Sequence, residues 1–107
     1  MGFFDFFMQS DINQGVKAYQ QREDAVLLDV RTPQEYRDGH IPGSKNVPLQ
    51  TIDKVDSVVE NKDTALYVYC YSGARSRQAV RILQQMGYTN VSNIGGIAAY
   101  RGKVESV

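Results

Sequence analysis

Two short apolar runs constrain the fold of this 107-residue chain more than any other feature of its sequence. Residues 25–30 read Ala-Val-Leu-Leu-Asp-Val, and residues 64–69 read Thr-Ala-Leu-Tyr-Val-Tyr. Continuous apolar runs with β-branched residues are typical of strands that are buried on both faces of a sheet. Because segments with helical spacing alternate with these runs, the pattern predicts an α/β fold with a mainly parallel sheet.

Capping and turn residues predict where the helices lie. Ser-Asp at positions 10 and 11 is typical of a helix N-cap, and the apolar spacing that follows predicts a helix to about Gln21. Residues 32–35, Thr-Pro-Gln-Glu, combine an N-cap, a proline at the first helical position and a capping glutamate, so a short helix is expected there, ended by Gly39. The same rules predict strands at 45–48 and 91–94, helices at 51–60 and 76–86, and a helical turn at 97–100.

Length and composition exclude several classes of protein. A chain of 107 residues suits one domain, and twelve basic against twelve acidic residues leave no net charge to attract nucleic acid. The chain has one cysteine and one histidine, so it cannot form an internal disulfide or a structural zinc site. A single thiol without a disulfide framework predicts a reducing, cytoplasmic environment.

Residues 1–10 are predicted to form a short apolar segment apart from the domain at residues 11–107. The segment carries four phenylalanines, but Asp5 interrupts it and no basic residue precedes Lys17, which does not fit a signal peptide. No stretch of the chain approaches the roughly 18 apolar residues of a membrane span. The phenylalanines either pack against the domain edge or contact a partner or membrane surface.

The residues after the second apolar run have the pattern of a reactive-cysteine loop. Cys70 follows the predicted strand, at the sheet edge where α/β folds bind ligands, and a short polar loop with Gly73 then leads into a helix. Main-chain N–H groups of such a loop converge on an anion, and together with the cation of Arg75 they would lower the pKa of the thiol. A cysteine that only fills space is the alternative, but it would lie within the strand rather than open a polar turn.

Three stretches of the sequence resemble the rhodanese family of sulfurtransferases, from about Ile12 to Val104. They are residues 28–48, with the segment Gly-His-Ile-Pro-Gly-Ser at 39–44, residues 70–76, and the Gly-Gly pair at 95–96 with Tyr100. The resemblance implies a single domain around a central five-stranded parallel sheet flanked by helices, with no metal or organic cofactor. It also implies that Asp29 and Arg31 form a structural pair below the loop, and that His40 lies in a structural turn.

The resemblance implies a sulfurtransferase in which Cys70 accepts a sulfane sulfur as a persulfide, with Arg75 as the second catalytic residue. The sulfur-binding main-chain N–H groups would come from Tyr71, Ser72, Gly73, Ala74 and Ser76. Thiosulfate or a persulfide would be the small-molecule donor. Because the chain has no second cysteine to take the sulfur, the acceptor must be external: cyanide, a thiol or a thioredoxin-like protein.

Two other functions remain open from the sequence. One is a non-catalytic rhodanese-like interaction module that binds a partner through residues 3–7, although the intact Cys70 and Arg75 argue against it. The other is a small phosphatase or arsenate reductase. Four residues separate Cys70 from Arg75, as in sulfurtransferases, whereas the related oxyanion enzymes have one residue more.

Overall fold

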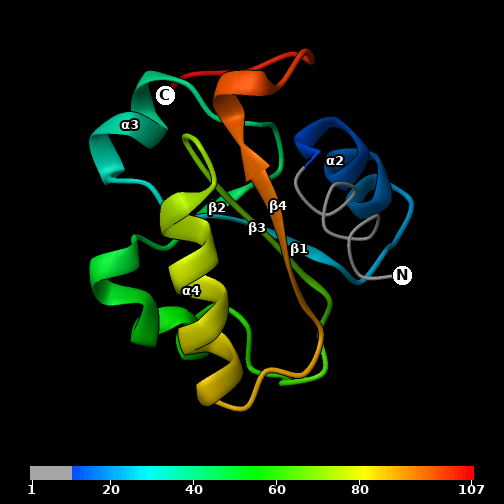
Figure 1. Ribbon diagram of the computed structural model, residues 1–107, viewed down its shortest axis with the longest axis vertical. Coiled ribbons are helices and arrows are strands. Elements are labelled where there is room, and N and C mark those ends of the chain that lie inside the picture. The colour runs from blue at the N-terminus through cyan, green and yellow to red at the C-terminus, as the bar shows by residue number, and fades with distance from the viewer. Residues whose placement is uncertain (1–10) are drawn as a thin grey trace.

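The computed structural model describes residues 11–107 and confirms the α/β fold with a parallel sheet (Figure 1). The four strands are β1 (Val26–Asp29), β2 (Lys45–Asn46), β3 (Leu66–Cys70) and β4 (Val91–Gly96), in the order β2-β1-β3-β4. All neighbouring strands pair in parallel. Their carboxyl ends therefore meet at one edge of the sheet, which is where Cys70 lies.

The five strands implied by the family resemblance are wrong for the described part of the chain, whose sheet has four. The individual residues predicted only these four, and the fifth came from the resemblance alone. Residues 12–20 form a helix, and the chain after β4 enters a 3₁₀ turn, η2 (Ile97–Ala99). The chain then runs to His40, where Glu105 forms an isolated antiparallel bridge instead of extending the sheet.

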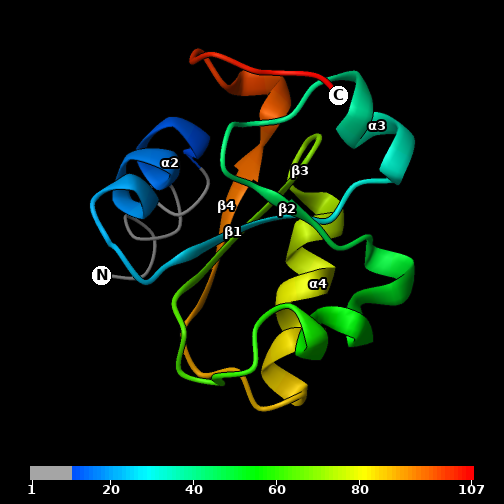
Figure 2. The same ribbon diagram turned by 180° about the vertical axis from the view of Figure 1, so that it is seen from behind.

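Helices cover both faces of the sheet (Figures 1 and 2). Helix α2 (Ile12–Gln20) packs on one face, and α4 (Ala74–Gln85) packs on the other with the 3₁₀ segment η1 (Leu49–Ser57). The α2-side core is formed by Ile12, Val16, Leu27, Ile41, Tyr69 and Ile94. The α4-side core is formed by Leu28, Val30, Val47, Ile52, Val55, Val59, Leu66, Val68, Cys70, Ala79, Leu83 and Tyr88.

Most helix boundaries agree with the capping rules. Asp11 caps α2 by accepting from Asn13 N, and the predicted capping box is present in α3 (Pro33–Asp38). The helix predicted from residue 76 begins two residues earlier, at Ala74, because Gly73 rather than the apolar pattern sets its start. The segment predicted as a helix at 51–60 is the 3₁₀ segment η1, with a kink at Thr51.

A buried ion pair fixes the segment that follows β1. The carboxylate of Asp29, at the end of the strand, is fully buried and accepts from Arg31 Nη2 at 2.7 Å and Arg31 Nε at 3.0 Å. The same Nη2 donates to the carbonyl oxygen of Gly39 at 2.6 Å. Asp29 and Arg31 thus form the expected pair, which ties the end of β1 to the turn after α3.

No helix among residues 11–107 is long and apolar enough to cross a bilayer.

Replacing Asp29 by asparagine should destabilise the fold strongly, because it leaves the buried guanidinium of Arg31 without a counter-charge. We expect Asp29→Asn to lower the free energy of unfolding by about 3–5 kcal/mol, measured by urea denaturation. Asp24→Asn is the matched control: this carboxylate is exposed and 4.0 Å from Arg22, so its loss should cost less than about 1 kcal/mol. Equal effects of the two substitutions would show that the buried pair has no special structural role.

Candidate functional site

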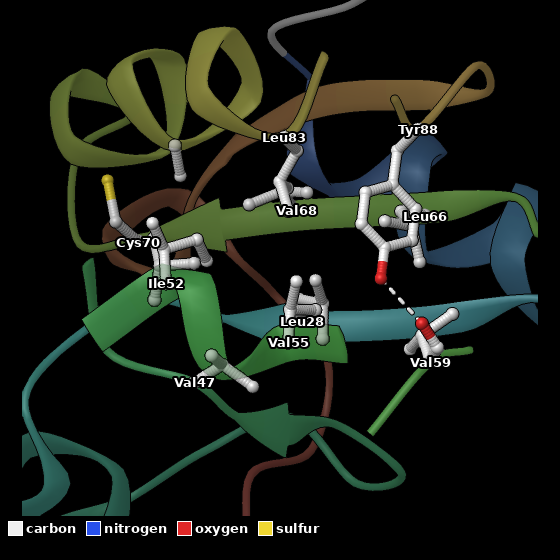
Figure 3. Close-up of a cluster of buried hydrophobic side chains, with 12 residues drawn as sticks. Leu28, Val47, Ile52, Val55, Val59, Leu66, Val68, Cys70, Leu83 and Tyr88 are labelled. Atoms are coloured by element: carbon white, nitrogen blue, oxygen red, sulfur yellow. Dashed lines mark hydrogen bonds between the residues drawn. The ribbon is translucent and has the colours of Figure 1, made fainter. Parts of the chain in front are cut away.

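The alternation of side chains along β3 positions the sulfur of Cys70. Leu66, Val68 and Cys70 point to the α4 side of the sheet, and all three are buried. Figure 3 shows Cys70 at the end of the strand, with its sulfur directed toward α4. At the opposite end of the same core, the hydroxyl of Tyr88 donates to the carbonyl oxygen of Val59 at 2.5 Å. The sulfur thus lies where the apolar core meets the loop.

The loop after β3, residues 70–76, closes around this sulfur, and we call it the cysteine loop. The N–H of Gly73 donates to Cys70 Sγ at 3.0 Å, and the N–H of Ser76 donates to it at 3.3 Å. Gly73 has φ +104°, a left-handed conformation that favours glycine over residues with a Cβ. The loop therefore presents the main-chain N–H groups of Gly73 and Ser76 to the sulfur.

The surroundings of the sulfur lower the pKa of the Cys70 thiol. Burial by itself raises the pKa, because it disfavours the thiolate. Hydrogen bonds from the Ser76 hydroxyl and from the N–H groups of Ser76, Gly73 and Ser72 stabilise the thiolate and outweigh the burial, so the net shift is downward. The site therefore makes an almost fully buried thiol easier to deprotonate than an ordinary cysteine.

Gly96 lets β4 approach the outside of the cysteine loop. A Cβ at position 96 would overlap the carbonyl oxygen of Tyr71 and lie 2.5 Å from Ser72 Cα. The N–H of Ala98 donates to the same Tyr71 carbonyl at 3.0 Å. The loop is thus held from outside by the end of β4, and the glycine is required by this close approach.

Asn93 on β4 supports the loop from a second side, a role that the sequence pattern did not predict. Its Oδ1 lies 2.7 Å from the hydroxyl oxygen of Ser76, and its Nδ2 donates to the carbonyl oxygen of Gly73 at 3.2 Å. The Ser76 hydroxyl in turn lies 3.4 Å from Cys70 Sγ. The one sequence signal that could have revealed Asn93 is the pair of polar residues, Ser92 and Asn93, inside a strand that also contains Val91 and Ile94.

Arg75 makes a two-point ion pair with Glu35 of α3. Its Nη1 and Nη2 donate to the two carboxylate oxygens of Glu35 at 2.8 and 3.1 Å. The side chains are each 34% exposed, and the hydrogen bonds from Arg75 lower the pKa of Glu35 to about 2. The sequence predicted Glu35 only as a capping residue, and nothing in its pattern indicated this long-range partner.

Four other residues in or near the cysteine loop do not bring their side chains to the sulfur. The side chains of Tyr71, Ser72 and Ala74 are exposed, and of these three residues only Ser72 has a main-chain N–H that acts on the sulfur. His40 is buried, and its ring stacks on that of Tyr36 with 3.8 Å between the ring centroids. Its Nδ1 lies 2.7 Å from the Tyr36 carbonyl oxygen. His40 thus belongs to a packed turn and, within residues 11–107, makes no hydrogen bond to Cys70.

The chemistry that this arrangement can perform is that of a stabilised sulfur nucleophile. The described residues, 11–107, contain no group of three histidine, cysteine or acidic side chains that could hold a metal ion. The N–H groups around Sγ can stabilise a negative charge on the sulfur itself or on an atom attached to it.

Comparison with known proteins gives consistent results. Residues 13–103 match the family model described as a rhodanese-like domain. The thiosulfate sulfurtransferase PspE of Escherichia coli is 41% identical over 71 residues, which cover 65% of this chain and 68% of that protein. A sulfurtransferase of Allochromatium vinosum is 44% identical over 79 residues, 73% of each chain. A solved structure, a rhodanese with anions from E. coli, has a TM-score of 0.73 and 34% identity over 78% of this chain and 99% of that chain. The chain therefore belongs to the rhodanese-like domain family of sulfurtransferases.

Proposed function

We propose that this protein transfers sulfane sulfur through a persulfide on Cys70, with thiosulfate or a persulfide as the donor. The observation that carries the proposal is the convergence of the Gly73 and Ser76 N–H groups on a buried sulfur at the end of a parallel strand. Relatives named as sulfurtransferases support it.

In the first half-reaction, the thiolate of Cys70 attacks the sulfane sulfur of thiosulfate. The new S–S bond forms as the bond to the sulfonate sulfur breaks, and sulfite leaves with the bonding electron pair. The N–H groups of Gly73 and Ser76 then stabilise the persulfide anion, as they do the thiolate. In the second half-reaction an acceptor nucleophile takes the outer sulfur and restores the Cys70 thiolate.

Arg75 is proposed as the residue that attracts the anionic donor. A guanidinium at the beginning of α4 is unfavourable for the helix unless a negative charge offsets it, and Glu35 supplies such a charge. An incoming thiosulfate would share the guanidinium with Glu35. The anions bound by the similar E. coli rhodanese are consistent with an anion site in this fold.

The acceptor is proposed to be external, because Cys70 is the only cysteine of the chain. Cyanide, a small thiol or a thioredoxin-like protein could take the sulfur. Small thiols and reduced protein acceptors are abundant in a reducing compartment, which supports the proposed cytoplasmic setting.

Phosphatase or arsenate reductase activity fits the site less well. The cysteine loop already lies within 3.0–3.3 Å of the sulfur through two N–H groups. That enclosure suits one added sulfur atom better than a tetrahedral oxyanion. A non-catalytic module would have no need for a lowered thiol pKa, so the direction of the Cys70 shift supports an enzyme.

Cys70→Ser should abolish sulfur loading without unfolding the protein, because a hydroxyl cannot form a persulfide and the change in size is small. Intact-mass measurement after thiosulfate treatment should show one added sulfur atom on the wild type, removable by cyanide, and none on the variant. Loading by a persulfide but not by thiosulfate would overturn the donor assignment. If neither donor loads Cys70, the protein is not a sulfurtransferase.

Ser76→Ala should raise the pKa of Cys70, because it removes the hydroxyl that hydrogen-bonds to the thiolate. Since the thiolate is the reactive form, the rate of loading rises with pH through this pKa and then levels off. We expect the rising limb of the pH profile to move to higher pH in Ser76→Ala. The matched control is Ser72→Ala, since Ser72 acts on the sulfur through its main-chain N–H, which alanine keeps. An identical profile for all three proteins would contradict a role for the Ser76 hydroxyl.

Arg75→Ala should lower kcat/KM for thiosulfate by about 10- to 1000-fold, the effect of losing one electrostatic contact to the reacting anion. Glu35→Gln is the companion variant, because glutamine preserves the capping box but leaves the guanidinium free for the donor. We expect Glu35→Gln to lose less activity than Arg75→Ala. Equal losses in steady-state assays would mean that the ion pair matters only for positioning the loop.

A further inference from the structure

The hydroxyl of Ser76 has more acceptors around it than it has hydrogens to give. Its oxygen lies 2.7 Å from Asn93 Oδ1, 3.1 Å from the carbonyl oxygen of Gly73 and 3.4 Å from Cys70 Sγ. A hydroxyl carries one hydrogen, so it donates to one of these atoms at a time. Ser76 is fully buried, which keeps bulk water from taking the hydrogen instead. The acceptor that receives the hydrogen therefore decides how strongly Ser76 acts on the sulfur.

An irregularity in β4 fixes which atom of the Asn93 amide faces Ser76. The register of β4 against β3 shifts at this point, and the N–H of Gly95 donates to Asn93 Oδ1 at 3.1 Å. On the other side of the amide, Nδ2 donates to the carbonyl oxygen of Gly73 at 3.2 Å. A main-chain N–H can only donate and a carbonyl can only accept, so a flipped amide would mismatch both partners. Asn93 therefore presents an acceptor, Oδ1, to the Ser76 hydroxyl.

The distances place the hydroxyl hydrogen on the Asn93 side. The 2.7 Å contact with Asn93 has the usual length of a hydroxyl hydrogen bond, whereas the 3.1 Å contact with Gly73 is long for one. The Gly73 carbonyl also accepts from Asn93 Nδ2 and from the N–H of Arg77. With the hydrogen on Asn93, a lone pair of the Ser76 oxygen faces Sγ, and the thiol S–H can donate to it. This arrangement suits the uncharged thiol of Cys70.

A thiolate at Cys70 reverses this preference. A hydrogen bond to a charged acceptor is about twice as strong as one between neutral groups. When the thiol loses its proton to solvent, the Ser76 hydroxyl therefore turns from Asn93 Oδ1 to Sγ. In a persulfide the negative charge lies on the outer sulfur, so Sγ attracts the hydroxyl less and Oδ1 takes it back. The hydroxyl thus has one position for the thiolate and another for the thiol and the persulfide.

We propose that Asn93 is a positioning residue whose Oδ1 competes with the Cys70 sulfur for the single hydrogen of the Ser76 hydroxyl. This inference rests on the proposed persulfide at Cys70. Of the three states of the sulfur, only the thiolate costs Asn93 its hydrogen bond with Ser76. The competition therefore disfavours the free thiolate relative to the persulfide, and Asn93 favours loading of the sulfur.

The charges around Sγ stay the same when Asn93 is replaced by a neutral residue. Arg75 of α4 interacts electrostatically with the Cys70 sulfur, and its partner is Glu35 of α3. The buried ion pair at the end of β1 lies below the loop, and the η1 residues that pack with Cys70 are apolar. A neutral substitution at position 93 therefore changes hydrogen bonds without changing charge.

The free thiol tests the competition without any sulfur transfer. Asn93→Leu removes Oδ1 at similar volume, so the Ser76 hydroxyl should turn to Sγ more readily. We expect the pKa of Cys70, read from the rate of alkylation by iodoacetamide against pH, to fall by about half a unit to one unit, the size of one neutral hydrogen bond. Ser92→Ala is the matched control and should leave the pKa unchanged, because alternation along β4 directs its side chain away from Ser76.

The direction of the shift separates the proposal from a purely structural role. If Asn93 only held the loop, its loss would weaken the donors to the sulfur and raise the pKa of Cys70, so a rise or no change would overturn the proposal. In a Ser76→Ala background the competition is absent, and adding Asn93→Leu should not lower the pKa further. An equal fall in both backgrounds would also overturn it. If circular dichroism shows that Asn93→Leu does not fold, Asn93→Val carries the same test, since a β-branched residue suits a strand.

Equilibrium loading tests the persulfide state. Wild-type and Asn93→Leu protein are kept in one mixture of thiosulfate and sulfite, at a pH above the Cys70 pKa of both, and intact mass gives the ratio of loaded to free protein. We expect this ratio to be about 3- to 10-fold lower in the variant. An equal ratio would overturn the return of the hydroxyl to Asn93. Failure of the wild type to load would overturn the proposed function, whereas normal loading without the fall in pKa overturns the competition alone.

Discussion

The site depends on the hydrogen bonds that two main-chain N–H groups donate to a buried sulfur. Removing a thiolate from water is costly, and the N–H groups of Gly73 and Ser76 replace the lost solvation. Other features keep these donors in place. The left-handed Gly73 turns the chain, the missing side chain of Gly96 lets β4 support the loop, and Asn93 binds the Gly73 carbonyl. A change in any of them acts on the sulfur indirectly.

Two ion pairs near the site differ in burial, and their roles differ accordingly. The Asp29–Arg31 pair is almost inaccessible to water and links the end of β1 to the turn at Gly39. Loss of either side chain would leave the charge of the other buried and unpaired. The Glu35–Arg75 pair is about one-third exposed, so water and an incoming anion can compete for the guanidinium. The protein thus places a fixed pair below the loop and an exchangeable pair beside it.

Local rules predicted much of this architecture from the sequence. The capping box at Thr32 and Glu35, the turn residue Gly73 and the position of Cys70 at a strand end each depend on neighbouring residues, and the structure has all three. Contacts between distant residues could not be read in this way. Glu35 and Arg75 are 40 residues apart, and Asn93 meets Ser76 across 17 residues only because β4 pairs with β3. The implied fifth strand was wrong for residues 11–107 because a resemblance gives a typical sheet rather than the one these residues form.

Cys70 belongs to the same packed cluster as Val30, Val47 and Ile52, so the reactive atom is also a core atom. Here an engineer who enlarges or repacks the α4-side core would also shift the sulfur relative to its donors. Efforts to make this domain more heat-resistant should therefore begin with the α2-side core, which does not contain the sulfur.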